Sequence, residues 1–335
     1  LFAEIAREPA FPADMIEVQR KQQLAAIAQQ RANPMGMAQR AAAPLLFGAN
    51  HPYAQAAGSL GEAAVVQAVS RDALAQWHRR WFVPGNASLV VAGDVTMAEL
   101  KAQAERAFGS WSGPTPPAKA VAAAQSQGTG KVYLIDKPGA PQALIFAGHV
   151  AANGARPDDL ALETVMRNFG GMATSRLNRN LRLDKHWSYG TLGTINAARG
   201  PRLFNVIAPV QTDKTKEAMV EVKREIDGVA GARPLAGEEL ESILRSQVSR
   251  LPGRFETLDS LLAAGLDLVN MGRDPGYYTE YATRLRRLDG PALNAAATAV
   301  VQPAQLTWIV VGDLRQIEAG VRELGYGEVV KIDAR

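Results

Sequence analysis

Cysteine is absent from the 335 residues, which excludes disulfides and any zinc or iron–sulfur site with Cys ligands. No apolar run approaches the roughly 18 residues of a membrane-spanning helix, so we expect no membrane span. The N-terminus has neither a starting Met nor the charged flank and apolar core of a signal peptide. This leaves open that the beginning of the chain is missing.

The charge balance also excludes one class of partner. The net charge is only +4, and the 37 basic residues are scattered among 33 acidic ones. Weak attraction to polyanions is possible, but no Lys/Arg block with interleaved aromatics supports nucleic-acid binding. An apolar fraction of 47% and a charged fraction of 21% are typical of a globular protein with two domains or one large one.

Hydrophobic periodicity and turn residues predict mixed helices and strands. In the first part we expect helices over 1–8, 12–30, 34–47, 70–81 and 96–107, a loop over 50–61 and a strand over 87–92. Pro, Gly, Ala, Gln and Ser dominate residues 113–130, which predicts a linker. Beyond it we expect strands over 132–136, 142–150, 188–197, 203–210 and 306–311, and helices from 157 and from 214 to about 300.

An internal repeat is the most informative pattern. Leu74, Pro84 and Gly93-Asp94 match Leu293, Pro303 and Gly312-Asp313, and each pair is 219 positions apart without a gap. Both copies have the order helix, Pro, short apolar strand, Gly-Asp, amphipathic helix. Self-similarity at one fixed offset predicts a duplication, and the long period implies two homologous α+β lobes.

The repeat also predicts how much of each lobe is present. If the second lobe begins near Lys131, the same offset places the start of the first lobe roughly 90 residues before Leu1. We therefore expect residues 1–110 to hold only part of a sheet, whose missing strands come from another polypeptide, from a further segment, or not at all.

A second pattern is the stretch from Leu181 to Gly190. It follows an amphipathic helical run that the pair Gly170-Gly171 interrupts, and a strand-like run begins at Ser188. Arg182 and Tyr189 are therefore predicted to face each other across one short turn. A guanidinium with five donors beside a phenol suits binding of peptide carbonyls or of a developing oxyanion. The structural alternative is a surface Arg at a helix C-terminus and a half-buried Tyr.

These residues resemble the M16 family of zinc metallopeptidases, which includes pitrilysin, insulinase and the mitochondrial processing peptidase. The resemblance covers nearly the whole chain. Its motifs are Gly170-Gly171, Ser175-Arg176-Leu177, Leu181-Arg182, Ser188-Tyr189-Gly190, His51-Pro52-Tyr53 with Gly58, and Phe82 to Asn86 running into Val91-Ala92-Gly93-Asp94.

The resemblance implies an α+β fold of two homologous lobes (LuxS/MPP-like), each a mainly antiparallel sheet packed against helices, the first lobe truncated at its N-terminus. The lobes would occupy residues 1–112 and 131–335, with the linker at 113–130. It also implies that Arg182 and Tyr189 reach into a peptide chamber as catalytic residues opposite a partner's zinc. Gly170 and Gly171 would join them in binding the substrate.

The family's zinc motif, however, is missing. The resemblance requires His-x-x-Glu-His and a later Glu, but no two of His51, His78, His149 and His186 have that spacing. Ala25 and Ala26 stand where active members carry Glu-Glu. We therefore expect no metal in this chain, zinc in the catalytic partner, and structural roles for the histidines. Glu238, Glu239 and Glu241 indicate a solvated helix start rather than a general base.

The resemblance implies a non-catalytic half or subunit of an M16 peptidase, which completes the chamber for a peptide or small unfolded protein and is inactive alone. The alternative is a scaffold subunit with the same fold and no role in cleavage. An autonomous hydrolase finds no support, because Ser175 has no evident His/Asp constellation. Bacterial members are often periplasmic, so we expect the periplasm, with the cytoplasm as the alternative.

Overall fold

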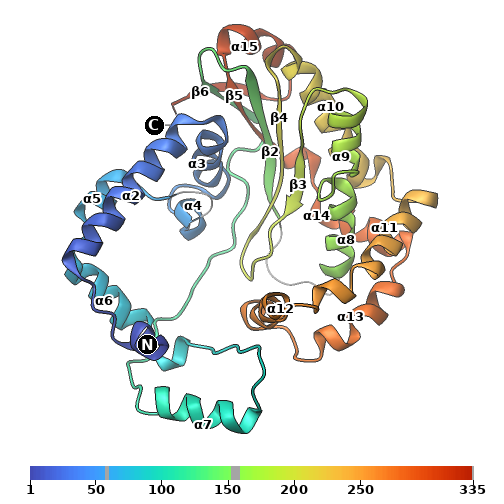
Figure 1. Ribbon diagram of the computed structural model, residues 1–335. Helices are drawn as coiled ribbons and strands as arrows, with labels where there is room; N and C mark the ends of the chain where they lie inside the picture. Colours follow the sequence, from blue (N-terminus) through green and yellow to red (C-terminus); the bar gives the residue numbers. More distant parts are fainter. Residues whose placement is uncertain (57–59, 152–158, 334–335) are drawn as a thin grey trace. The chain divides into compact units, whose positions relative to one another are not determined.

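The computed structural model describes residues 1–56, 60–151 and 159–333 (Figure 1). Two compact units interleave along the chain. Unit 1 comprises Leu1–Ile27, Gly61–Ala120 and Leu251–Tyr277, and unit 2 comprises Ala28–Leu60, Val121–Arg250 and Tyr278–Arg335. Gly58 and the expected helix start at 157 lie outside the described residues.

Unit 2 contains one mixed sheet of six strands in the order β3-β4-β2-β5-β1-β6. Strand β2 is antiparallel to β4 and β5, β3 is antiparallel to β4, and β1 is parallel to both β5 and β6. The strands are β1 (Lys131–Asp136), β2 (Gln142–Ala151), β3 (Leu192–Ile195), β4 (Arg202–Gln211), β5 (Thr307–Gly312) and β6 (Glu328–Ile332). The sequence predicted all of them except β6, although β3 is shorter than expected.

Side chains alternate strictly between the two faces of this sheet. In β1, Val132 and Leu134 belong to one buried cluster, and Tyr133 and Ile135 belong to the other. Four helices cover the first face: α8 (Asp159–Phe169), α10 (Thr215–Asp227), α14 (Gly290–Val300) and α15 (Leu314–Glu323). Helix α3 (Pro34–Phe47) covers the second (Figure 1). Burial on both faces explains why β1 and β5 are continuous apolar runs.

The remaining helices mostly follow the prediction, but residues 52–56, which were expected in a loop, form a short helix, and so do residues 63–68, where none was expected. The expected helix over 214–300 is in fact a series of shorter helices separated by turns. No helix among the described residues is both long and apolar enough to cross a bilayer. The elements not yet named are α1 (Phe2–Arg7), α2 (Ala13–Ala32), α4 (Pro52–Ala56), α5 (Ala63–Ala68), α6 (Arg71–Trp81), α7 (Met97–Phe108), α11 (Gly237–Ser249), α12 (Leu258–Met271) and α13 (Tyr277–Arg286).

The two copies of the Gly-Asp repeat have different structures. Asp313 accepts a hydrogen bond from the backbone N–H of Arg315, which caps α15, and another from Gly139 at 3.0 Å. The Arg315 guanidinium and these N–H donors hold the pKa of Asp313 well below its usual range. In the first copy the cap of α7 is Thr96 instead, in a reciprocal capping box with Glu99.

The prediction of a strand over residues 87–92 is wrong. These residues are unpaired, and Leu89 and Val91 are 48% and 44% exposed. The matching strand β5 lies between β1 and β2, which satisfy its backbone groups on both sides. A strand forms only with such a neighbour, and the described residues supply none to 87–92. Residues 1–112 therefore contain no strand in their described part, rather than part of a sheet.

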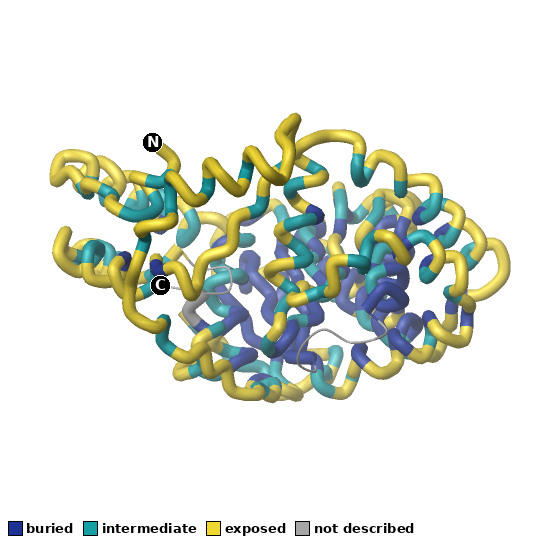
Figure 2. The backbone as a smooth tube through the Cα atoms, turned by 90° about the horizontal axis from the view of Figure 1, so that it is seen from below, coloured by how far each residue is buried: buried dark blue, intermediate teal, exposed yellow. Residues whose placement is uncertain are grey.

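Unit 1 also has little core. Its buried apolar side chains in the described structure are Ile27, Val83 and Ala264, whereas unit 2 holds two large clusters. Figure 2 shows the buried residues gathered in one part of the chain and long exposed stretches elsewhere. The stability of the described structure therefore depends mainly on the sheet of unit 2 and the helices that cover it.

His149 lies fully buried in β2 as a neutral ring. Its Nε2 atom accepts a hydrogen bond from the backbone N–H of Gln302 at 3.1 Å, so Nε2 carries no proton. Nδ1 then donates to the carbonyl oxygen of Val150, also at 3.1 Å. Burial lowers the pKa of His149, and its effect exceeds that of the Val150 bond, which alone would raise the pKa.

We expect His149 to make stability depend on pH. Below the ordinary histidine pKa of about 6.5, the unfolded chain binds more protons than the folded one, so the free energy of unfolding falls as pH drops. In His149→Gln this contribution is absent. The free energy of unfolding of the variant should therefore fall less steeply from pH 7 to pH 5, by up to about 1.4 kcal/mol per pH unit. Urea denaturation at several pH values measures both slopes; parallel curves for the two proteins would contradict this assignment.

Candidate functional site

The glycine pair Gly170-Gly171 lets the end of α8 pack tightly on β3. A Cβ atom added to Gly170 would lie 2.1 Å from the backbone nitrogen of Gly193, so no larger residue fits there. Gly170 is buried and Gly171 is exposed. This close approach is a structural reason for the first glycine. The substrate-binding role predicted for the pair remains a prediction.

Arg182 lies on a π-helix that buried leucines anchor. The short helix α9 (Arg176–Asn178) continues directly into the π-helix η2 (Arg179–Asp184). Leu177 and Leu181 are fully buried in the core of unit 2, whereas Arg182 is exposed. The sequence placed the helix end close to Arg182, and the chain leaves the helix two residues later.

The turn after η2 brings Tyr189 back toward Arg182. His186 adopts a left-handed backbone conformation with φ of 57°, which reverses the chain. The backbone N–H groups of Trp187 and Ser188 then donate to the carbonyl oxygen of Leu181. Tyr189 precedes β3 rather than lying in it, and it is 89% exposed.

The amide groups of a buried Asn178 and an exposed Gln211 hold the two sides of this turn. Asn178 donates to the carbonyl oxygen of Thr191 at 3.0 Å and accepts from the Thr191 N–H at 2.8 Å. Gln211, at the end of β4, donates its backbone N–H to Trp187 and its side-chain amide to the carbonyl oxygen of His186. No local pattern indicated the role of Gln211, because this residue lies 25 positions along the chain from His186.

Arg182 and Tyr189 line one pocket of about 410 Å³. No hydrogen bond or ion pair joins the Arg182 guanidinium or the Tyr189 hydroxyl to another described residue. The predicted proximity of the two residues is therefore present, while their catalytic role remains a prediction. The other lining residues are Gln142, Leu183, His186, Trp187, Ser188 and Gln211.

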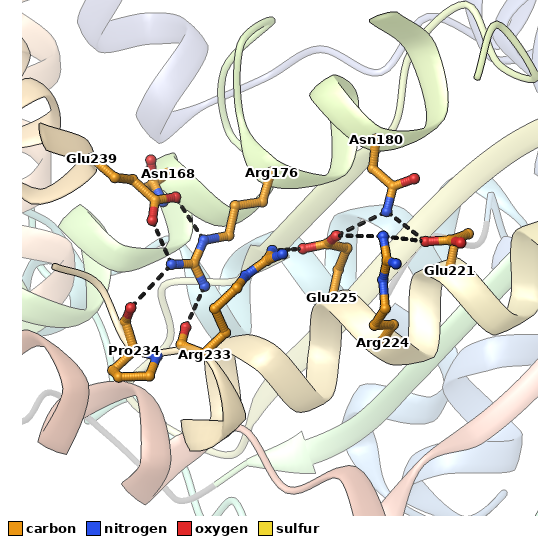
Figure 3. Close-up of polar contacts among 9 residues, drawn as sticks. All are labelled: Asn168, Arg176, Asn180, Glu221, Arg224, Glu225, Arg233, Pro234 and Glu239. Atoms are coloured by element: carbon orange, nitrogen blue, oxygen red, sulfur yellow. Dashed lines mark hydrogen bonds and ion pairs between the residues drawn. The ribbon is translucent and has the colours of Figure 1, made fainter. Parts of the chain in front are cut away.

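A buried Arg176 anchors the helix that leads to this pocket (Figure 3). Its Nε and Nη2 atoms donate to the two carboxylate oxygens of Glu239 at 2.6 and 2.5 Å, and Nη1 donates to the carbonyl oxygen of Arg233 at 2.6 Å. Asn168 also donates to Glu239 at 2.7 Å. Glu239 lies in the first turn of α11, as expected, but it is only partly solvated, because the distant guanidinium of Arg176 binds it.

Charge compensation sets the ionisation of Glu239. Burial alone would raise the pKa of this carboxyl group. Hydrogen bonds from Arg176 and Asn168, with the charges of Arg176 and Arg233, outweigh burial and lower the pKa. Glu239 is therefore the anionic partner of a structural ion pair. This environment is the opposite of the raised pKa that a general acid needs.

A second set of contacts fixes η2 against α10 (Figure 3). The side-chain amide of Asn180 donates to Glu221 and to the buried Glu225, both at 2.8 Å. Glu225 also pairs with Arg233, and Glu221 pairs with Arg224 at 2.6 Å. All of these residues except Glu221 line a second cavity of about 580 Å³, in which opposite charges largely neutralise one another.

Zinc does not fit the described residues. No three His, Asp or Glu side chains among them gather closely enough to hold a metal ion. His51 contacts the carbonyl oxygen of Ala122 at 3.1 Å, and His78 contacts that of Ala6 at 3.0 Å. Ala25 and Ala26 lie in α2 and carry no ligand atom.

We expect Gly170→Ala to destabilise the fold. The added Cβ would meet the backbone of β3, which cannot move aside as a flexible side chain does, so the free energy of unfolding should fall by about 3 kcal/mol or more. Gly93→Ala is the matched control, because no atom lies within 4 Å of its added Cβ. Chemical denaturation of both variants tests this, and equal stabilities would refute the packing argument.

Arg176→Ala should also be strongly destabilising. The substitution leaves Glu239 without its cationic partner and removes the donors to two carbonyl groups, at a cost of about 3 kcal/mol. Arg245→Ala serves as control, since its pair with Glu241 is exposed and contributes about 0.3–0.5 kcal/mol. A loss of stability no larger in Arg176→Ala than in Arg245→Ala would show that the buried pair is not needed.

Comparison with known proteins places the chain in a family. The family model described as "Peptidase M16 inactive domain" matches residues 68–246, more than half of the chain. None of the curated proteins that were compared matches the sequence.

Solved structures share the fold at low identity. A peptidase M16 inactive domain from Pseudomonas fluorescens is 18% identical with a TM-score of 0.85, covering 93% of this chain and 73% of the other. A protease from Helicobacter pylori is 17% identical with a TM-score of 0.82, covering 93% and 74%. The periplasmic protease PqqL from Escherichia coli is 16% identical with a TM-score of 0.70, covering 89% and 32%. With an α+β fold shared with these structures and more than half of its length matched, the chain belongs to the peptidase M16 inactive-domain family.

Proposed function

We propose that this chain is the non-catalytic half or subunit of an M16 zinc peptidase. It completes the peptide-binding chamber and supplies Arg182 and Tyr189 to the zinc site of a catalytic partner. One observation carries the proposal: in a chain of the inactive-domain family, a guanidinium and a phenol that have no hydrogen-bond or ion-pair partner among the described residues line the same pocket. Structural arginines of this unit, such as Arg176, are instead paired.

The two side chains suit a role in binding the bond to be cleaved. The guanidinium of Arg182 supplies several N–H donors in a rigid plane, and the Tyr189 hydroxyl supplies one more. Directed at the carbonyl oxygen of the scissile bond, these donors stabilise the negative charge that develops there as water attacks. The partner holds the zinc and the carboxylate that accepts the proton of the attacking water.

The nearby sheet edge supports binding of an extended peptide. β3 is an edge strand of the six-stranded sheet and begins three residues after Tyr189. A peptide added along such an edge is held by backbone hydrogen bonds, so its length and extended conformation matter more than its sequence. The proposed substrates are therefore peptides or small unfolded proteins.

The periplasm is the proposed compartment. The structural similarity to PqqL, which is a periplasmic protease, supports it. The cytoplasm is the alternative.

Removing either side chain should slow peptide turnover by the assembled pair. Loss of a donor to a developing oxyanion reduces kcat by about 100- to 1,000-fold, and we expect that range for Arg182→Ala and Tyr189→Phe. The measurement is steady-state cleavage of a fluorogenic peptide by this chain mixed with its zinc-bearing partner. Arg179→Ala is the control, since Arg179 is exposed on the same π-helix but lines the other cavity. Unchanged turnover in both test variants would reject the proposal.

A scaffold role is the second candidate. It is supported by a structural neighbour from Complex III2 of Candida albicans, which is 12% identical with a TM-score of 0.73 and covers 98% of this chain and 79% of the other. As a scaffold, the chain would bind its partner normally, and no cleavage would depend on Arg182 or Tyr189. The same turnover measurement, combined with co-purification of the variants, separates the two functions.

A further inference from the structure

The pocket of Arg182 and Tyr189 is lined by basic but not by acidic side chains. Arg182 and His186 are its ionisable basic residues, and none of its lining residues is Asp or Glu. Gln142 and Gln211 add amide groups on the strands beside it. Such a lining favours an anionic group over a cationic one.

Neighbouring acids do not neutralise this pocket. Lys185 pairs with Glu221 at 3.5 Å, so that carboxylate already has a cationic partner. Asp184, the acid nearest in sequence to Arg182, lines the other cavity. No ion pair joins the guanidinium of Arg182 to a described carboxylate.

Apolar surface lies beside the charge. Leu183 and Trp187 also line the pocket, and Trp187 packs against the core while Lys185 lies 5.2 Å over its ring. A ligand with a short aliphatic stem and an anionic tip matches this combination, because the stem contacts the apolar side chains and the tip reaches the donors.

We propose that this pocket binds a carboxylate of the substrate polypeptide, and so gives the chain a preference for acidic peptides. This inference rests on the proposed function only in that a polypeptide occupies the pocket. The carboxylate comes either from a Glu or Asp side chain or from the C-terminus of a short peptide. Both offer two oxygens to the guanidinium of Arg182, and a bidentate pair uses two of its five N–H donors and leaves the others for the carbonyl oxygen of the scissile bond.

Binding to the chain alone tests the preference, without any partner or cleavage. The probes are fluorescent eight-residue peptides that differ at one central position, Glu or Gln, each made with a free acid or an amide at the C-terminus. At low salt we expect the Glu peptide to bind about tenfold more tightly than the Gln peptide. Tighter binding of the free acids than of the amides, with Glu and Gln equivalent at the central position, would assign the pocket to the terminal carboxylate, which also supports carboxylate binding.

Charge-matched variants locate the effect. Arg182→Gln should abolish the preference for the carboxylate, whereas Arg179→Gln, which removes the same charge from the same π-helix, should retain it. Equal affinity for all four peptides, including no measurable binding of any, overturns the inference, as does a preference that survives in Arg182→Gln.

The result is independent of the turnover experiment. If turnover falls in Arg182→Ala but acidic peptides are not preferred, the proposed function stands and this inference fails. If the preference is present but turnover does not change, the pocket binds carboxylates without taking part in cleavage.

Discussion

The candidate site depends on one interaction, the ion pair between the buried guanidinium of Arg176 and Glu239. This guanidinium joins the short helix that leads to Arg182 to two groups that lie 57 and 63 positions further along the chain, the carbonyl oxygen of Arg233 after α10 and the carboxylate of Glu239 in α11. A buried cation is tolerated only when its donors are satisfied, and here a carboxylate and two carbonyl groups satisfy them. The same contacts that make this pair costly to break therefore fix the start of the segment that carries the exposed Arg182.

Hydrogen bonds from side-chain amides fix the rest of the segment that carries Arg182 and Tyr189. Asn180 binds two glutamates of α10, Asn178 binds the backbone of Thr191, and Gln211 binds the turn at His186. The buried Asn178 and Asn180 thus hold the segment that carries Arg182 and Tyr189, while the guanidinium and the phenol themselves form no hydrogen bond or ion pair with described residues. This combination of a rigid frame and free donors is what binding of a substrate group requires.

The two halves of the internal repeat show how context decides structure. The segment Thr307–Gly312 is a fully buried central strand, because β1 and β2 flank it and helices cover it. Its counterpart at residues 87–92 has similar apolar residues but no flanking strand among the described residues, and it is unpaired. Asp313 caps a helix, whereas in the first copy Thr96 does so. Similar local sequence therefore produces different structure when long-range partners differ.

The sequence by itself determined the α+β class, most helices and strands of unit 2, the repeat, and the separation of seven residues between Arg182 and Tyr189. These features depend on local periodicity and turn residues, which neighbouring positions encode. Only the tertiary structure decided that residues 87–92 stay unpaired, that Glu239 binds Arg176, and that Gln211 supports the turn. Each of these depends on a partner far along the chain, or on the lack of one, and no local pattern specifies which distant group that partner is.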